Sequence, residues 1–110
     1  MKTLQSKAEF EELLAGEDAV LAYFSTDVCS VCKVLKPKVV EMAEANFPEM
    51  ELLYVQSDLL PEVAAQNRVF TAPTVIVFFA GRETIRKSRA FGVDELMAEI
   101  ERPYSLMFDE

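Results

Sequence analysis

Three short apolar runs set the framework of this chain. They occupy residues 19–25, 51–57 and 74–79, and the last is almost wholly β-branched or aromatic. Runs of this length with few polar residues are typical of strands that are covered on both faces, because a half-exposed strand would alternate apolar and polar positions. The chain is therefore predicted to build a central sheet with helices on both of its faces.

Helical patterns occupy the segments between these runs. Ser6 and Glu9 form a capping-box pattern that opens the first helix, and Gly16 ends it. Pro37 falls inside the longest helical pattern, and Pro103 is expected to end the last one. Apolar residues recur at helical spacing at about 7–15, 29–46, 61–68 and 93–102.

The order of these elements predicts an α/β fold with a central mixed sheet of four or five strands, the fifth being a brief strand at 2–4. Strands that alternate with helices are expected to pair in parallel, and a turn at Ala80-Gly81 then adds an antiparallel hairpin strand at about 83–89. With 110 residues and no linker or repeat, the chain is expected to form a single domain over 1–110.

Charge and composition exclude several kinds of function. The net charge of −8 disfavours a nucleic-acid partner, because phosphate binding requires clustered Lys and Arg. No apolar stretch approaches the ~20 residues of a membrane span, so no membrane partner is expected. The first residues lack the apolar core of a secretory signal, which favours a cytoplasmic location. The basic residues Arg82, Arg86, Lys87 and Arg89 are interpreted as the solvated face of a hairpin.

Cys29 and Cys32 are the two cysteines of the chain, and they carry its clearest chemical signal. Thiols three residues apart at a helix start lie about 5–6 Å from each other, within the reach of a disulfide. In a reducing compartment such a pair is more often catalytic, redox-sensing or metal-binding than a permanent bridge. Zinc and iron–sulfur sites normally take four ligands, which two Cys and no His do not supply, so no metal or other cofactor is expected. Simple burial of both thiols is the remaining alternative to a redox role.

The chain resembles the thioredoxin family in its element order, in the C-x-x-C motif at 29–32 and in the Ala72-Pro73 pair before the third apolar run. The match covers nearly the whole chain, with Pro37 at the family's helix-kink position and Ala80-Gly81 similar to its glycine hairpin. The resemblance implies a thioredoxin-like fold and a thiol:disulfide oxidoreductase that reduces protein disulfides through a mixed disulfide. The implied partners are disulfide-containing proteins and an electron donor similar to thioredoxin reductase, with the chain as a monomer or weak homodimer.

The resemblance also implies roles for individual residues. Cys29, at a helix start whose unpaired amides favour the thiolate, would be the nucleophile, and Cys32 would resolve the mixed disulfide. Lys33 and Lys36 are expected to add electrostatic support to the Cys29 thiolate. The Ala72-Pro73 bond would be cis, and the backbone beside it would pair with an extended client. The implied substrate-binding residues are Val28, Ser30, Val31, Ala72, Pro73 and Gly92.

Several positions depart from the family pattern. Between the cysteines, this chain has Ser30-Val31 in place of the family's Gly-Pro. Before the first cysteine, it has Val28 in place of the usual aromatic residue. Many thioredoxins place a buried acid six residues before that cysteine, but this chain has Tyr23 there. A phenol is a poor general base at neutral pH. Asp58 is the nearest other acid by pattern, and it is interpreted as a helix cap ahead of residue 61.

These departures keep a second function open. The chain could be a thioredoxin-like binding or redox-sensing module with weak or no turnover, which recruits a partner at the cis-proline groove or at its C-terminal extension. That extension, residues 103–110, is apolar for a terminus and is expected to dock back on the fold. Glutathione-dependent glutaredoxin chemistry is disfavoured, because Phe91-Gly92 stands where that family has Gly-Gly.

Overall fold

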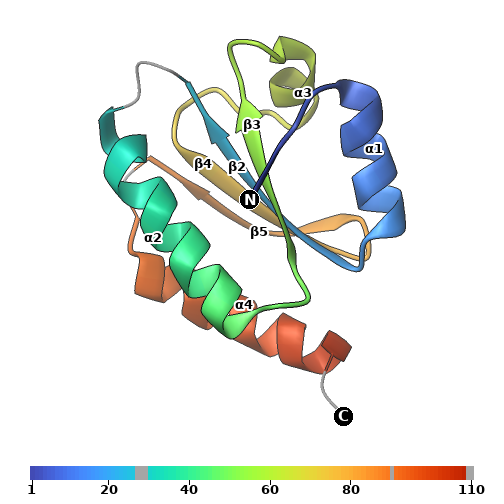
Figure 1. Ribbon diagram of the computed structural model, residues 1–110, viewed down its shortest axis with the longest axis vertical. Helices are drawn as coiled ribbons and strands as arrows, with labels where there is room; N and C mark the ends of the chain where they lie inside the picture. Colours follow the sequence, from blue (N-terminus) through green and yellow to red (C-terminus); the bar gives the residue numbers. More distant parts are fainter. Residues whose placement is uncertain (27–29, 90, 109–110) are drawn as a thin grey trace.

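The computed structural model describes residues 1–26, 30–89 and 91–108, with residues 30–32 described by their backbone alone. Figure 1 shows α2 and α4 on one side of the strands and α1 and α3 on the other. Within the described ranges, no helix has the length and apolar character needed to cross a membrane. The elements in chain order are β1 (Lys2–Thr3), α1 (Lys7–Gly16), β2 (Ala19–Ser25), α2 (Ser30–Asn46), β3 (Glu51–Gln56), α3 (Pro61–Gln66), β4 (Thr74–Phe79), β5 (Arg82–Ser88) and α4 (Val93–Phe108).

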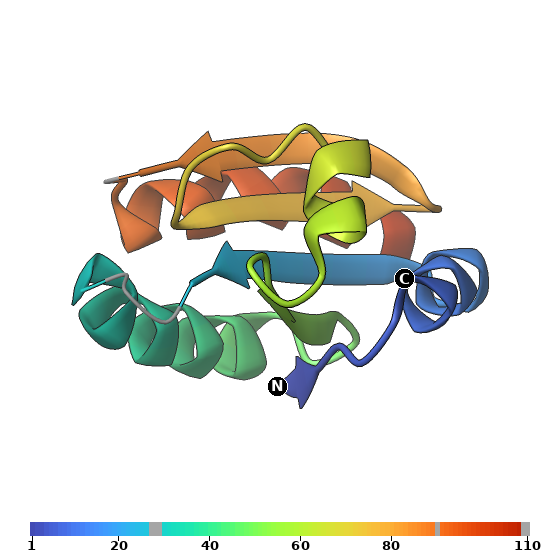
Figure 2. The ribbon, with the colours of Figure 1, turned by 90° about the horizontal axis from the view of Figure 1, so that it is seen from above.

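The strands form one five-stranded sheet in the order β1-β3-β2-β4-β5, which Figure 2 shows from above. β3 pairs in parallel with both β1 and β2, whereas β4 is antiparallel to both β2 and β5. The predicted mixed sheet is therefore confirmed, including the brief N-terminal strand.

The parallel direction predicted for residues 74–79 was wrong, because β4 runs antiparallel to β2. α3, with its 6 residues, rises only about 9 Å, whereas a strand of that length spans about 20 Å. This helix is too short to carry the chain back along the sheet. β4 therefore begins at the end of the sheet where β3 stops.

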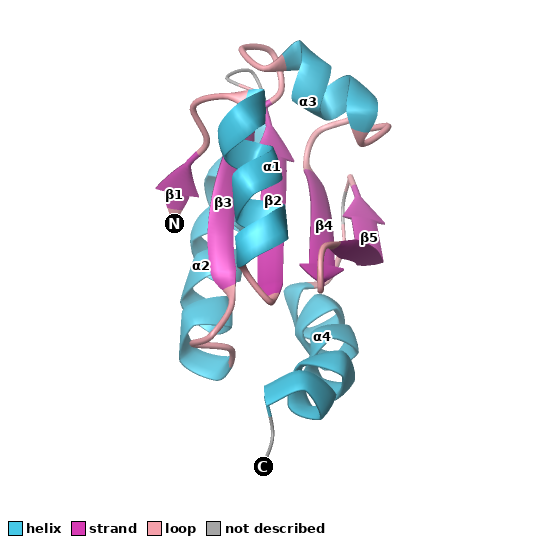
Figure 3. Cartoon of the chain, turned by 90° about the vertical axis from the view of Figure 1, so that its right-hand side faces the viewer, coloured by secondary structure: helices cyan, strands magenta, loops and turns pink. Residues whose placement is uncertain are grey.

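Each of the two helix layers covers a separate apolar cluster. All 7 residues of β2 are buried, and alternate residues of this strand enter different clusters. Tyr23 packs in the cluster of α2 and α4, and Phe24 packs in the cluster of α1 and α3. Figure 3 shows α1 in front of the central strands and α2 behind them. The prediction of a sheet covered on both faces is confirmed.

The last helix is longer than the sequence predicts. α4 contains Pro103, which was expected to end it. Beyond this proline, the Tyr104 ring centroid lies 4.8 Å from that of Phe47 and 4.7 Å from that of Phe108. The Tyr104 hydroxyl also accepts a hydrogen bond from the backbone N–H of Glu49 at 2.9 Å. These contacts offset the helix hydrogen bond that a proline removes. Residues 103–108 thus dock on the fold, as predicted, but as the final turns of α4.

Candidate functional site

The C-terminal end of β2 lies where several chain segments meet. Its residue Phe24 pairs with Thr74, the first residue of β4. On its other side, the backbone N–H of Ser57 donates to the carbonyl oxygen of Ser25 at 2.8 Å. In Figure 1, β2 runs towards the upper left, where α2 begins. The end of the central strand and the start of the longest helix therefore occupy one end of the molecule.

The loop before β4 reaches the same end and is fixed by hydrogen bonds. Its Ala72-Pro73 peptide bond is cis, as the family resemblance implies, and Pro73 is buried. The Thr74 hydroxyl, itself buried, donates to the carbonyl oxygen of Thr71 at 2.8 Å. The backbone N–H of Arg89 donates to the carbonyl oxygen of Pro73 at 2.7 Å. The proline is thus held between the start of β4 and the chain that leaves β5.

The structure places some of the predicted site residues and not others. Cys29 and Val28 lie outside the described residues. The backbone of residues 30–32, which includes Cys32, forms the first turn of α2. Gly92 is exposed, and its carbonyl accepts the hydrogen bond from Leu96 N at 3.1 Å at the start of α4. Because β5 ends opposite the first residue of β4, the Gly92 segment follows at this same end of the sheet.

Tyr23 has the most unusual polar environment near this end. Its side chain is fully buried, and its hydroxyl has no hydrogen-bond partner among the described residues. Burial, with a smaller contribution from the nearby Tyr54 phenol, raises the pKa of Tyr23 to about 12. The Tyr23 hydroxyl therefore stays protonated at neutral pH, which agrees with the prediction that this residue is a poor general base.

Replacing Tyr23 with phenylalanine should raise the free energy of unfolding by about 1 kcal/mol at pH 7, because a buried hydroxyl without a partner costs about 1–3 kcal/mol. The pKa adds a second signature. The folded state holds the phenol proton more tightly than the unfolded chain, so the wild type loses stability as the pH rises from 10 towards about 12, and Tyr23→Phe lacks that loss.

Urea unfolding at pH 7 and at pH 11 measures both effects. Tyr54→Phe is the matched control, since Tyr54 is only half-buried, and it should change stability little at pH 7. A Tyr23→Phe protein that is less stable than the wild type at pH 7 would contradict the prediction, because it would mean that the hydroxyl makes a stabilising hydrogen bond.

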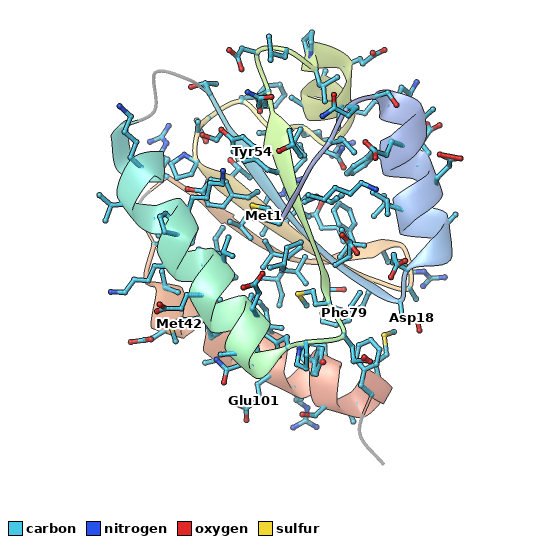
Figure 4. All side chains as sticks on the ribbon, viewed as in Figure 1. Met1, Asp18, Met42, Tyr54, Phe79 and Glu101 are labelled. Atoms are coloured by element: carbon cyan, nitrogen blue, oxygen red, sulfur yellow. The ribbon has the colours of Figure 1, made fainter. Side chains whose placement is uncertain are left out.

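A groove of about 850 Å³ runs beside α2, and its lining also includes Met1, Tyr54 of β3 and Ser25 and Thr26 at the end of β2. The Lys36 ammonium lies 3.7 Å from the centroid of the Tyr54 ring inside this groove, a cation–π distance. Figure 4 shows Tyr54 and Met1 between α2 and β3. Lys36 thus has a defined partner in Tyr54, and its predicted support for the Cys29 thiolate stays a prediction.

Asp58 does not cap α3, so the helix-cap interpretation was wrong. The N-cap residue is Leu60, which makes no side-chain cap hydrogen bond. Asp58 is exposed in the turn after β3, where the N–H groups of Leu59 and Leu60 both bond to the carbonyl oxygen of Gln56. That turn leaves Asp58 two positions short of the N-cap.

Sequence reasoning missed the structural role of Arg86. Its Nε and Nη2 atoms donate to the two Glu83 carboxylate oxygens at 2.9 and 2.8 Å. Nη2 also donates to the carbonyl oxygen of Asn67 at 2.6 Å, and Nη1 donates to that of Arg68 at 3.3 Å. The hydrogen bonds from Arg86 are the main reason that the pKa of Glu83 is lowered. Arg86 therefore ties β5 to the loop that leads to Pro73.

A family model described as Thioredoxin matches residues 2–102. The chain belongs to the thioredoxin family. Among its relatives, the thioredoxin-like protein YdfQ of Bacillus subtilis is 28% identical over 106 residues, which cover 96% of this chain and 94% of YdfQ. The thioredoxin of Chlamydia trachomatis is 32% identical over 102 residues, which cover 93% of this chain and 98% of that protein.

Solved structures support the same family assignment. The X-ray structure of Fasciola hepatica thioredoxin matches with a TM-score of 0.81 and 30% identity, covering 93% of this chain and 98% of that one. Plasmodium falciparum thioredoxin matches with a TM-score of 0.83 at 22% identity, covering 93% of this chain and 99% of that one, a likeness of fold. This thioredoxin-family protein thus has the thioredoxin fold that the sequence predicts.

Proposed function

We propose that this protein is a thiol:disulfide oxidoreductase that reduces disulfides of protein clients through Cys29 and Cys32. The observation that carries the proposal is that the first turn of α2, which contains Cys32, and the Pro73 loop lie at the same end of the sheet. Membership of the thioredoxin family supports it further. Val28, Ser30, Val31, Ala72, Pro73 and Gly92 are proposed to contact the client.

The proposed reaction moves two electrons in two exchange steps. The Cys29 thiolate attacks one sulfur of the client disulfide, a Cys29–client disulfide forms, and the other client sulfur leaves as a thiolate that takes up a proton. The Cys32 thiolate then attacks the Cys29 sulfur. The mixed disulfide breaks, a Cys29–Cys32 disulfide forms, and the second client thiol is released. The client is reduced, the protein is oxidised, and an external dithiol or a reductase similar to thioredoxin reductase restores the dithiol.

Tyr23 affects the expected rate of the second step, in which Cys32 attacks the mixed disulfide. The attacking form of Cys32 is the thiolate, so its proton must leave. With a pKa of about 12 and a buried hydroxyl, Tyr23 does not take that proton at neutral pH. We propose that water or Cys29 accepts it, which makes resolution slower than with a buried carboxylate as base. A pH–rate profile that reveals a carboxylate-like base would contradict this proton path.

A disulfide-reduction assay tests the proposal directly. The wild type should accelerate reduction of a protein disulfide by dithiothreitol, and Cys29→Ser should lower the acceleration by more than ~100-fold, because the nucleophile is gone. Leu106→Ser serves as the control, since Leu106 is 76% exposed near the end of α4. Equal and negligible rates for the wild type and Cys29→Ser would contradict the proposal.

The alternative is a binding or redox-sensing module that recruits a partner without rapid turnover. The buried, protonated Tyr23 is the observation that favours it, since the fold then offers no strong base at this position. Under this alternative, the wild type would bind a partner at the Pro73 loop with the same low reduction rate as Cys29→Ser. The assay above therefore separates the two functions.

A further inference from the structure

Phe70 is an exposed aromatic residue in the loop that leads to Pro73. Its side chain is 83% exposed, although Val69, directly before it, is buried at 8%. Burying a phenylalanine side chain is worth about 1.5–3 kcal/mol, so the folded chain leaves this contribution unused at Phe70. Large exposed apolar side chains that gather in one region mark interaction sites more often than single ones do.

The Phe70 loop is fixed in place before any partner arrives. Arg86 bonds the carbonyl oxygens of Asn67 and Arg68 on one side of Phe70, and Glu83 holds the guanidinium of Arg86 in turn. On the other side, the Thr74 hydroxyl bonds the carbonyl oxygen of Thr71. An apolar side chain on an ordered loop costs less entropy on binding than one on a mobile loop. Phe70 is thus presented as a preorganised contact.

Other exposed apolar side chains occur at the same end of the molecule. Leu59, 63% exposed, lies in the turn after β3, and Val34, 77% exposed, lies near the start of α2. Figure 1 shows these turns and the helix start at the upper end, away from the C-terminal turns of α4. The end of the sheet where α2 begins therefore carries several apolar side chains open to solvent.

Positive charge borders the Phe70 loop in a chain whose net charge is −8. Arg68 is exposed two residues before Phe70, and it lies close enough to Glu83 to help lower the pKa of that carboxyl. Arg89, also exposed, donates its backbone N–H to Pro73. Neither arginine forms an ion pair within the described part of the chain. A client with an acidic side chain would complement these two guanidinium groups.

We propose that Phe70 selects the clients of this protein by packing against a large apolar side chain next to the client's disulfide, while Arg68 and Arg89 favour an acidic residue beside it. The inference rests on the proposed function, because the client must bring its disulfide to Cys29. Phe70 acts as a specificity-determining residue: it contacts the client and takes no part in the exchange of sulfur bonds.

Two disulfide-bonded peptides of equal length test the proposal, one with Phe and Glu beside the reacting cysteine and one with two serines there. The measured quantity is the ratio of kcat/KM for the two peptides, compared between protein variants, so that the intrinsic reactivity of each peptide cancels. Phe70→Ser should lower the wild-type preference for the Phe–Glu peptide about tenfold, the loss typical of a contact that anchors a partner. Adding Arg68→Glu to Phe70→Ser should lower the preference for the Phe–Glu peptide further.

The controls separate this inference from the proposed function. A small neutral disulfide, bis(2-hydroxyethyl) disulfide, has neither an aromatic ring nor an acidic group and reports on the dithiol alone, so its rate should be the same for the wild type, Phe70→Ser and Leu106→Ser. Leu106→Ser, at the far end of the molecule, should keep the peptide preference. An unchanged preference in Phe70→Ser, with normal reduction of the small disulfide, would overturn the Phe70 inference alone. A wild type that reduces neither the peptides nor the small disulfide would overturn the proposed function and this inference with it.

Discussion

Cys32→Ser should stop the reaction at a covalent complex between the protein and its client. With the resolving thiol gone, Cys29 still attacks the client disulfide, but no second thiolate lies in place to release it. A client disulfide mixed with this variant should give a stoichiometric adduct whose mass is the sum of the two chains. Non-reducing electrophoresis and intact-mass spectrometry both measure it.

The matched variants make this trap specific. Cys29→Ser and the double variant Cys29→Ser/Cys32→Ser should give no adduct, and dithiothreitol should release the client from Cys32→Ser. An adduct in Cys29→Ser and none in Cys32→Ser would reverse the assigned roles of the two thiols. No adduct in any variant would favour the binding module over the oxidoreductase.

The second large effect is expected at the end of α4. Tyr104→Ala removes the ring that packs on Phe47 and Phe108, and it also removes the hydroxyl that accepts the Glu49 N–H. Truncating a fully buried aromatic residue costs about 3–5 kcal/mol, and Tyr104 is half-buried, so we expect a loss of about 2–3 kcal/mol. For a domain of this size, that lowers Tm by about 10 °C.

Thermal unfolding followed by far-UV circular dichroism measures this loss. Leu106→Ala is the control, because this residue lies on the same turns of α4 but is 76% exposed, and it should shift Tm by no more than about 2 °C. Equal shifts in the two variants would contradict the prediction, because the Tyr104 contacts would then contribute no more to stability than an exposed leucine. Sedimentation of both variants checks that the oligomeric state is the same.

Local signals in the sequence were sufficient for most of the fold. The run at 19–25 predicted a strand covered on both faces, and all of β2 is buried. The pattern at 74–79 gave the bounds of β4 correctly. The parallel direction predicted for this strand was wrong, because strand direction depends on whether the preceding helix is long enough to span the sheet. The pattern at 61–68 does not show how long that helix is. The prediction that Pro103 ends the last helix was wrong for a similar reason, since the Phe47–Tyr104 ring contact and the Glu49–Tyr104 hydrogen bond join residues more than 50 positions apart along the chain.

The site was predictable in its family features and not in its hydrogen bonds. The cis bond at Pro73 followed from a family resemblance. The hydrogen bonds between Arg86 and Glu83 did not follow, because these residues are three apart, and residues three apart on a regular strand face opposite sides. A β-bulge opposite Val77 and Phe78 shifts the register and brings Glu83 and Arg86 together. The periodicity of the sequence does not predict that bulge.

The tyrosines of this chain give it an internal optical reporter. With 3 Tyr and no Trp, its emission on excitation beyond the phenylalanine absorption band comes from Tyr23, Tyr54 and Tyr104. The Tyr23 and Tyr54 rings lie 6.4 Å apart, near enough to exchange excitation energy, and the Lys36 ammonium sits over the second ring. In a Tyr104→Phe background, only this pair emits, one ring beneath α2 and the other in the groove beside it. A change in the emission of this pair on oxidation of the dithiol would then report the redox state without any added label.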